Sequence, residues 1–251
     1  MTSELWTQAA TRHMIDGASG KIATVVAEPH DAPGGGTKGS VLLVHGRNGA
    51  PEQPQIAEMA RAYLARGWRV VAPELPHSAA LPETGPANQV TFSGHTKAAA
   101  QIWDWIAEQW PGQPRALAGH SLGSFAIAQL ATHMPQPHHL LAMSPPLSGK
   151  VLYNSRLAMG KAAIDAVRAE APLFLDEMAT ADAGPSLRRS PAPLAVVTGA
   201  SDGLVRIADA RAYFAASPNG RYFGALPDEH HCPSGAACAE MLRAALLALG
   251  A

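Results

Sequence analysis

The chain contains 251 residues, of which 47% are hydrophobic and 16% are charged, and its formal net charge is −1. This length suffices for one large domain with a substantial core, and the near-neutral charge supplies no basic field that would attract nucleic acid or an anionic membrane. Because no apolar run approaches the ~20 residues that span a bilayer and the N-terminus lacks the pattern of a signal peptide, we expect a cytoplasmic protein with one domain over residues 1–251.

Short β-rich runs alternate with longer amphipathic stretches along most of the chain. Strands are expected over residues 21–29, 40–46, 68–76, 115–120, 138–146, 193–199 and 221–227. Helices are expected over residues 54–66, 97–110, 122–133, 206–216 and 236–250. This alternation predicts an α/β fold in which helices cover both faces of a mainly parallel sheet. The glycine-rich residues 31–39 between the first two strands have the turn chemistry of an exposed loop.

Residues 147–190 interrupt this alternation. They contain helical stretches, such as the one over residues 161–178, but they do not continue the regular order of strand and helix. We interpret them as an insertion over one end of the sheet.

A lone serine, Ser121, stands between two glycines in the segment GHSLG, where the strand expected over residues 115–120 gives way to a helix. Serine is common at this position as an N-cap, because its hydroxyl can accept a hydrogen bond from a free backbone N–H. The alternative is a nucleophile, which requires a histidine to accept the hydroxyl proton and a carboxylate to hold that histidine in the correct tautomer.

The candidate carboxylate is Asp202, which lies in a glycine-containing turn directly after the strand expected over residues 193–199. Ligands of open α/β sheets bind beyond the carboxyl ends of the strands, so each catalytic partner should follow a strand. The turn after residues 138–146 contains no carboxylate, and most other acidic residues lie on expected helix faces. The alternative role for Asp202 is that of an ordinary turn or N-cap aspartate.

Two adjacent histidines, His230 and His231, follow the strand expected over residues 221–227 and precede the last helix. We prefer His231 as the base, because its position between two prolines leaves room for the chain to turn back over the sheet. His230 remains the alternative, and either residue could also be a surface loop histidine. His120, beside Ser121, is interpreted as a structural residue that points away from the nucleophile.

These segments resemble the α/β-hydrolase superfamily, in which the triad follows the chain order Ser, Asp, His. GHSLG resembles the nucleophile elbow, VLLVHGRNG the oxyanion loop, GASDGLV the acid turn and HHCP the histidine loop. Together they account for nearly the whole chain outside residues 147–190. The resemblance implies catalytic roles for Ser121, Asp202 and His231, and oxyanion donors in the backbone N–H groups of Leu122 and Arg47, with Asn48 as the alternative to Arg47.

The resemblance also implies a function and a role for the insertion. We expect a serine hydrolase that cleaves a carboxylic ester of a small or medium acyl substrate through an acyl-enzyme, with residues 147–190 as a cap or lid. Apolar residues of the insertion are expected to form one wall of the pocket, and the alternative is that half of them pack on the sheet. They are Leu152, Tyr153, Leu157, Met159, Leu173 and Phe174.

Other functions use the same fold and remain open at this stage. The same three residues could hydrolyse a carbon–carbon bond, a lactone or a thioester. The chain could also be a catalytically silent protein that binds a small ligand. Epoxide hydrolysis and dehalogenation are disfavoured, because similar enzymes of that type carry an aspartate where Ser121 stands.

The expected partner is a small acyl substrate, and no cofactor is expected. The two cysteines, Cys232 and Cys238, are too few for a disulfide framework and are expected to be reduced thiols. No HExxH motif occurs among the 11 histidines, so no metal site is expected. The oligomeric state is open, a homodimer included.

Overall fold

The continuous apolar runs of the sequence form the middle of one twisted sheet. The computed structural model describes residues 6–7, 10–18, 20–29, 36–134 and 136–251, and in this part of the chain eight strands pair in the order β1-β2-β4-β3-β5-β6-β7-β8. The strands are β1 (Thr11–Gly17), β2 (Gly20–Ala27), β3 (Gly39–Val44), β4 (Trp68–Pro73), β5 (Arg115–His120), β6 (Leu140–Met143), β7 (Leu194–Gly199) and β8 (Gly220–Leu226). All neighbouring pairs from β4 to β8 are parallel, whereas β1 and β2 are antiparallel to their neighbours.

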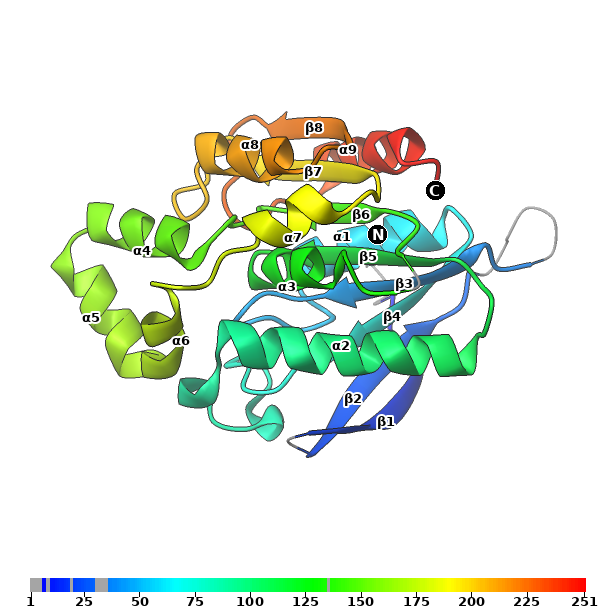
Figure 1. The fold of residues 1–251 in the computed structure, drawn as a ribbon, viewed down its shortest axis with the longest axis horizontal. Coiled ribbons are helices and arrows are strands. Elements are labelled where there is room, and N and C mark those ends of the chain that lie inside the picture. Colours follow the sequence, from blue (N-terminus) through cyan, green and yellow to red (C-terminus); the bar gives the residue numbers. More distant parts are fainter. Residues whose placement is uncertain (1–5, 8–9, 19, 30–35, 135) are drawn as a thin grey trace.

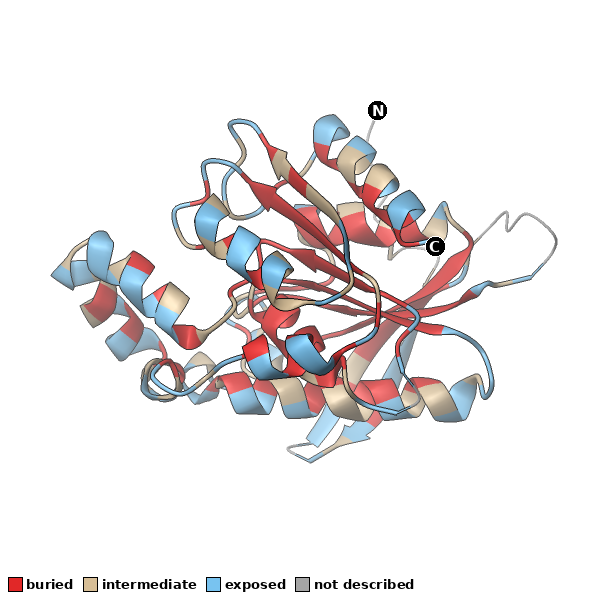
Figure 2. Ribbon diagram, turned by 45° about the horizontal axis from the view of Figure 1, so that its top comes forward, coloured by how far each residue is buried: buried red, intermediate tan, exposed pale blue. Residues whose placement is uncertain are grey.

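Helices cover both faces of this sheet, as Figure 1 shows. On one face lie α1 (Pro54–Leu64) and α9 (Ala236–Ala248), whose apolar side chains form a buried cluster with alternate residues of the strands. On the other face a second cluster involves α2 (Phe92–Gln109), α3 (Leu122–Leu130), α7 (Gly184–Arg189) and α8 (Ile207–Ala216). Figure 2 shows the result, a buried sheet between helices that are buried only on their inner sides. The predicted α/β class with a mainly parallel sheet is confirmed.

Several elements differ from the sequence prediction. Strand β1 was not predicted, because its burial pattern leaves most side chains exposed and therefore produces no apolar run. Helix α2 begins at Phe92 rather than at residue 97, because the Thr91 hydroxyl accepts the Gly94 N–H and caps the helix. Helix α3 ends at Leu130, three residues before the predicted end.

The insertion after β6 contains α4 (Gly149–Ala158), α5 (Lys161–Glu170) and α6 (Pro172–Glu177), followed by α7. Figure 1 shows α4, α5 and α6 together at one end of the molecule, whereas α7 lies beside α3. Helix α6 is attached to the start of α2: the Phe174 ring stacks on Phe92 with centroids 4.4 Å apart, and Glu177 accepts the Ser93 N–H at 2.9 Å.

Two short 3₁₀ helices, η1 (Pro82–Thr84) and η2 (Ala87–Gln89), lie between β4 and α2. Within the described ranges, none of the helices combines the length and the apolar character needed to cross a bilayer. The predicted glycine-rich loop falls mostly on residues 31–35, which lie outside the described residues.

Candidate active site

Ser121 occupies a strained turn between β5 and α3. Its backbone has φ 53° and ψ −118°, a conformation that non-glycine residues rarely adopt. The turn is tight because α3 passes directly over β3: a Cβ on Gly123 would lie 2.0 Å from the Val44 carbonyl oxygen. The Ser121 side chain makes no capping hydrogen bond to the helix. Ser121 thus stands at the N-cap position of α3 without capping the helix through its side chain, and the hydroxyl is available to another partner.

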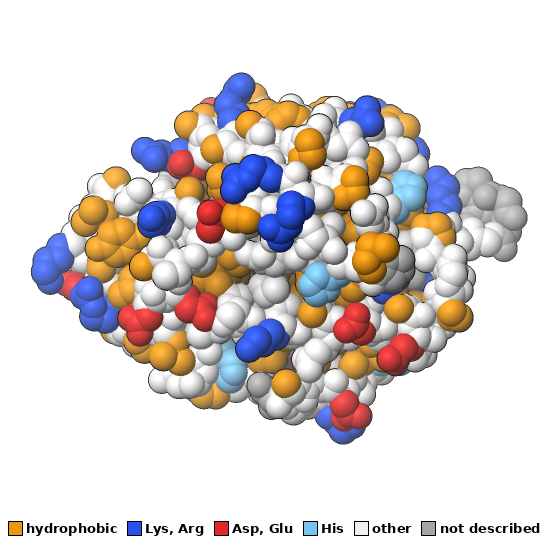
Figure 3. Space-filling view, in the orientation of Figure 1, with side chains coloured by type: hydrophobic (Ala, Val, Ile, Leu, Met, Phe, Trp, Pro, Cys, Tyr) orange, Lys and Arg blue, Asp and Glu red, His pale blue; other side chains and the backbone are white. Residues whose placement is uncertain are grey.

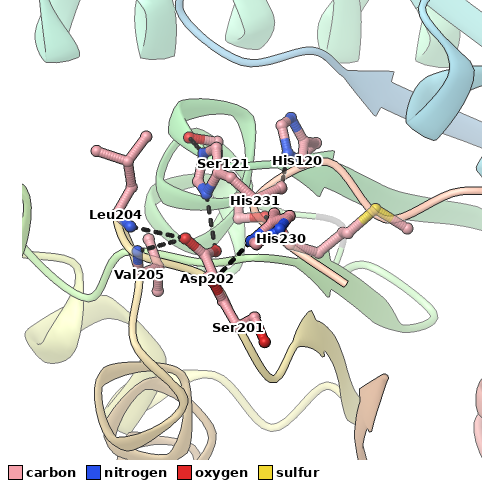
Figure 4. Close-up of polar contacts among 10 residues, drawn as sticks. His120, Ser121, Ser201, Asp202, Leu204, Val205, His230 and His231 are labelled. Carbon is pink, nitrogen blue, oxygen red and sulfur yellow. Dashed lines mark hydrogen bonds and ion pairs between the residues drawn. The ribbon is translucent and has the colours of Figure 1, made fainter. Parts of the chain in front are cut away.

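That partner is His231, as Figure 4 shows. Ser121 Oγ lies 2.8 Å from His231 Nε2, and His231 Nδ1 lies 2.8 Å from Asp202 Oδ2. Because an ionised carboxylate only accepts hydrogen bonds, Nδ1 carries the ring proton and Nε2 accepts the serine hydroxyl proton. The structure thus joins the three sequence-predicted side chains into one hydrogen-bonded chain, although they are separated by up to 110 positions.

Asp202 remains ionised in a buried position. Burial by itself would raise the pKa of this carboxyl, but the hydrogen bond and charge of His231 and the N–H groups of Leu204 and Val205 outweigh it and lower the pKa below its ordinary value. Oδ1 accepts those two N–H groups at 2.8 and 2.9 Å, while Oδ2 accepts His231. Asp202 is therefore both a turn aspartate and the partner of the imidazole.

The two candidate histidines point in different directions (Figure 4). His230 is exposed and contacts the Ser201 carbonyl through Nδ1 at 3.0 Å, whereas His231 faces Ser121. The histidine loop is held against the acid turn by the bond from the Ser201 N–H to the Glu229 carbonyl, at 2.9 Å. The structure therefore brings His231, and not His230, to the serine.

Two further histidines, His120 and His45, are buried beside the site and make hydrogen bonds to the backbone around it. Burial lowers the pKa of His120 to about 3 and that of His45 to about 4, so both rings are neutral near pH 7. Nε2 of His120 lies 2.8 Å from the His231 carbonyl oxygen. His45 Nε2 accepts the Leu75 N–H at 2.9 Å and so fixes the end of β3. Neither ring makes a hydrogen bond to the Ser121 hydroxyl in the described structure.

The predicted oxyanion donors lie around the serine. Leu122 is the first residue of α3, so its N–H has no partner within the helix and points out of the helix end. Arg47 and Asn48 belong to the loop after β3, and both line the same cavity as Ser121 and Leu122. The structure thus places the N–H of Leu122 and the loop that carries both alternative second donors beside Ser121.

The cavity next to Ser121 is small, at about 190 Å³. The cap contributes fewer apolar residues to it than predicted: Leu152 and Phe174 line the cavity. The other four of the predicted wall are 39–54% exposed. They are Tyr153, Leu157, Met159 and Leu173, and Figure 3 shows hydrophobic side chains at this end of the molecule.

Helical spacing explains why Leu152 lines the cavity whereas Tyr153 and Leu157 do not. Leu152 and Arg156 are four residues apart, so they share one face of α4, and that face meets the cavity. Tyr153 and Leu157 share the next face, which is exposed.

Sequence reasoning missed the polar part of the pocket. Gln53, Gln55 and Arg156 line it. Glu170, at the end of α5, joins the insertion to the loop after β3 by accepting Asn48 Nδ2 at 2.8 Å and by pairing with Arg47 at 3.3 Å. Polar residues spaced singly through a helix and a loop give no sequence signal that would distinguish them from ordinary surface residues.

Both cysteines are free thiols in the structure, Cys232 exposed and Cys238 buried. In the described ranges no group of three His, Cys, Asp or Glu side chains has the arrangement of a metal site.

Comparison with known proteins identifies a family of α/β serine hydrolases. The model of the family described as serine aminopeptidase, S33, matches residues 35–171. No curated protein matches the chain by sequence.

Several solved structures superpose on the chain. Est1E from Butyrivibrio proteoclasticus has 16% identity and a TM-score of 0.75, and the alignment covers 96% of this chain and 99% of that chain. XC6422 from Xanthomonas campestris, described as an a/b serine hydrolase without lid, has 16% identity and a TM-score of 0.68 over 99% and 97% of the two chains. The esterase domain of a Rhodothermus marinus protein has 17% identity and a TM-score of 0.69 over 94% and 97%. At this level of identity the likeness shows the fold.

Proposed function

This chain belongs to the serine aminopeptidase S33 family of α/β serine hydrolases, and we propose that it hydrolyses carboxylic esters of small acyl groups through an acyl-enzyme on Ser121. The observation that carries the proposal is the continuous chain of hydrogen bonds from Ser121 Oγ through His231 to Asp202, with 2.8 Å at each step. The strained backbone of Ser121 supports it, because strain of this kind persists where the surrounding structure serves a function.

In the acylation step, Ser121 Oγ attacks the carbonyl carbon of the ester while its proton passes to His231 Nε2. Asp202 stabilises the imidazolium that forms, through its hydrogen bond to Nδ1. The carbonyl oxygen becomes an oxyanion, and each backbone N–H that points at it contributes about 3 kcal/mol to the barrier reduction. Collapse of the tetrahedral intermediate breaks the bond to the alcohol oxygen, which takes the proton from His231. The products of this step are the alcohol and the Ser121 ester.

In the deacylation step, water replaces the alcohol. His231 takes a proton from the water as its oxygen attacks the acyl carbon, a second tetrahedral oxyanion forms, and the bond to Ser121 Oγ breaks as the serine recovers the proton. The acid leaves, and the three residues return to their starting protonation.

The size and charge of the cavity favour a small ester over a peptide. A volume of about 190 Å³ lies below the range of sites for drug-sized ligands. No Asp or Glu occurs among the described residues that line the cavity, so the free amino group of a peptide N-terminus would meet no carboxylate. The similar esterase domain from Rhodothermus marinus supports ester chemistry on this fold.

A substrate screen tests this proposal. We expect p-nitrophenyl acetate and butyrate to be hydrolysed faster than the octanoate, a lactone, a thioester or an amino acid p-nitroanilide, and we expect Ser121→Ala to abolish the reaction. Faster turnover of the lactone, the thioester or the anilide would replace ester hydrolysis by that activity.

A further inference from the structure

The pocket beside Ser121 is positively charged. Arg47 contributes a guanidinium from the loop after β3, and Arg156 contributes a second one from the cap helix α4. The other polar residues of the described lining, such as Gln53, Gln55 and Asn48, are neutral. This charge is unusual for a pocket that would take only neutral esters, because a partly buried cation loses hydration that nothing in a neutral substrate replaces.

Arg47 already has an anionic partner. Its Nη1 lies 3.3 Å from Glu170 Oε1, and its Nη2 lies 3.4 Å from Glu170 Oε2. The Glu170 oxygen Oε1 also accepts Asn48 Nδ2 at 2.8 Å. Both oxygens of this carboxylate are therefore engaged by the oxyanion loop.

Arg156 has no such partner among the described residues. None of their carboxylates lies within ion-pair distance of its guanidinium, and its Nε is shielded from solvent without a hydrogen-bond acceptor. Burial lowers the pKa of Arg156, and the neighbouring Arg47 charge lowers it further, while Glu170 raises it. A guanidinium nevertheless stays charged in proteins, and Arg156 has no ion pair among the described residues, so an anion in the cavity would give this charge a direct partner.

A position near the end of a helix is an alternative explanation, because the last turn of α4 attracts a cation. That effect does not require the side chain to enter the cavity. Arg156 instead follows Leu152 by four residues and lines the cavity with it, together with Ser121.

We propose that Arg156 binds a carboxylate of the substrate, so that this enzyme acts on small esters that carry a free carboxylate group, an inference that rests on the proposed ester hydrolysis. Carboxylate is preferred over phosphate because the two guanidinium groups and Glu170 leave one positive charge, which matches a monoanion.

The test compares esters that differ only in charge. Monomethyl succinate, glutarate and adipate are paired with the corresponding amide esters, in which a neutral carboxamide replaces the carboxylate, and methyl 4-phosphonobutanoate tests phosphate-like groups. Methanol release gives kcat and KM for each. We expect kcat/KM to favour at least one carboxylate ester over its amide by ~10- to 100-fold, and we expect it to exceed that of the phosphonate.

Substitutions assign this preference to Arg156. In Arg156→Met the ratio of carboxylate to amide ester should fall toward one, mainly through a higher KM, and Arg156→Lys should restore part of it. The matched control is Arg168→Met on α5, because Arg168 is an exposed cap arginine that pairs with Asp165 at 2.7 Å. This variant should keep the wild-type ratio. Calorimetric binding of glutarate to Ser121→Ala, with and without Arg156→Met, reads the same site without turnover and should show ~10-fold weaker binding in the double variant.

The outcomes separate this inference from the proposed function. Hydrolysis of the amide esters with no preference for carboxylate, or an equal loss on both substrates in Arg156→Met, would overturn the inference and leave ester hydrolysis standing. A preference for the phosphonate would overturn the carboxylate assignment. If no ester of any length is hydrolysed, ester hydrolysis fails, and glutarate binding still decides whether Arg156 holds a carboxylate. If Arg156→Met does not fold, the wild-type ratio and Arg156→Lys decide.

Discussion

Nε2 of His120 donates a hydrogen bond to the carbonyl oxygen of His231 at 2.8 Å. His120, the residue before Ser121, therefore holds the backbone of His231 in place. The two rings also pack together, with centroids 5.1 Å apart. Because the carbonyl oxygen only accepts, Nε2 carries the proton of the neutral His120 ring, and burial disfavours a second proton on Nδ1, which has no hydrogen-bond partner among the described residues.

The buried histidines should make the protein sensitive to acid. Burial lowers the pKa of His120 from 6.5 to about 3 in the folded state. Below pH 6.5 the unfolded chain therefore binds a proton at His120 that the folded chain does not bind. The free energy of unfolding that this residue contributes above pH 6.5 is lost as the pH falls toward 3. Between pH 7 and pH 5.5 this single group should lower the free energy of unfolding by about 1 kcal/mol.

Urea unfolding at the two pH values measures this effect. His120→Gln should reduce the difference between pH 7 and pH 5.5 by about 1 kcal/mol, and His13→Gln on the exposed face of β1 serves as the control. An unchanged difference in His120→Gln would show that this ring is not held neutral by the fold.

Asp202→Asn should keep the fold and lose activity. An amide at this position can donate to His231 Nδ1, which would move the ring proton to Nε2 and leave no acceptor for the Ser121 hydroxyl. We expect kcat to fall by ~10⁴, by analogy with the same substitution in other serine hydrolases. Asp209→Asn on α8, which removes an ion pair to Arg206 before the helix, should retain wild-type kcat. Retention of a tenth of the activity in Asp202→Asn would contradict the assigned role.

His231 and His230 form a natural pair for comparison. Only His231 contacts Ser121 Oγ, whereas His230 contacts the Ser201 carbonyl. His231→Ala should therefore lower kcat by ~10⁴ or more, and His230→Ala should cost less than ~10-fold. Steady-state kinetics on the best ester gives both values, and equal losses would refute the choice of His231.

Gly123→Ala should distort the tight turn at Ser121 between β5 and α3. The new Cβ would lie 2.0 Å from the Val44 carbonyl oxygen, so α3 must shift away from β3 and carry the Leu122 N–H with it. We expect a loss of about 1–3 kcal/mol in unfolding free energy together with a lower kcat. Gly203→Ala is the matched control, because its Cβ would meet only the Met159 methyl group, at 3.4 Å. Equal thermal midpoints for the two variants would contradict the packing argument.

The order of residues in the chain and their positions after strands predicted the three hydrogen-bonded side chains of the site. The alternation of strand and helix patterns predicted most of the elements. Ser121, Asp202 and His231 each follow a strand, and parallel strands bring such positions to one edge of the sheet. The local pattern also predicted the buried strand β3, which ends in a continuous apolar run. The exposed edge strand β1 was not predicted, because few of its side chains enter the core.

The shape of the pocket could not be predicted from the sequence in the same way. Which face of α4 meets the cavity depends on how the cap packs against α2, through pairs such as Phe174 with Phe92. That contact joins residues 82 positions apart and has no local signature. The sequence therefore suggested an apolar wall, whereas the structure turns Leu157 outward and Arg156 inward.

Reaction with a fluorophosphonate, followed by peptide mapping, shows whether Ser121 is a nucleophile, because this reagent modifies a serine only when its hydroxyl is activated. We expect one label, on Ser121, that disappears in Ser121→Ala and forms much more slowly in His231→Ala but not in His230→Ala. A folded wild-type protein that takes no label, under conditions that modify a control esterase, would show that the hydrogen-bonded serine is not a nucleophile and that the pocket only binds its ligand.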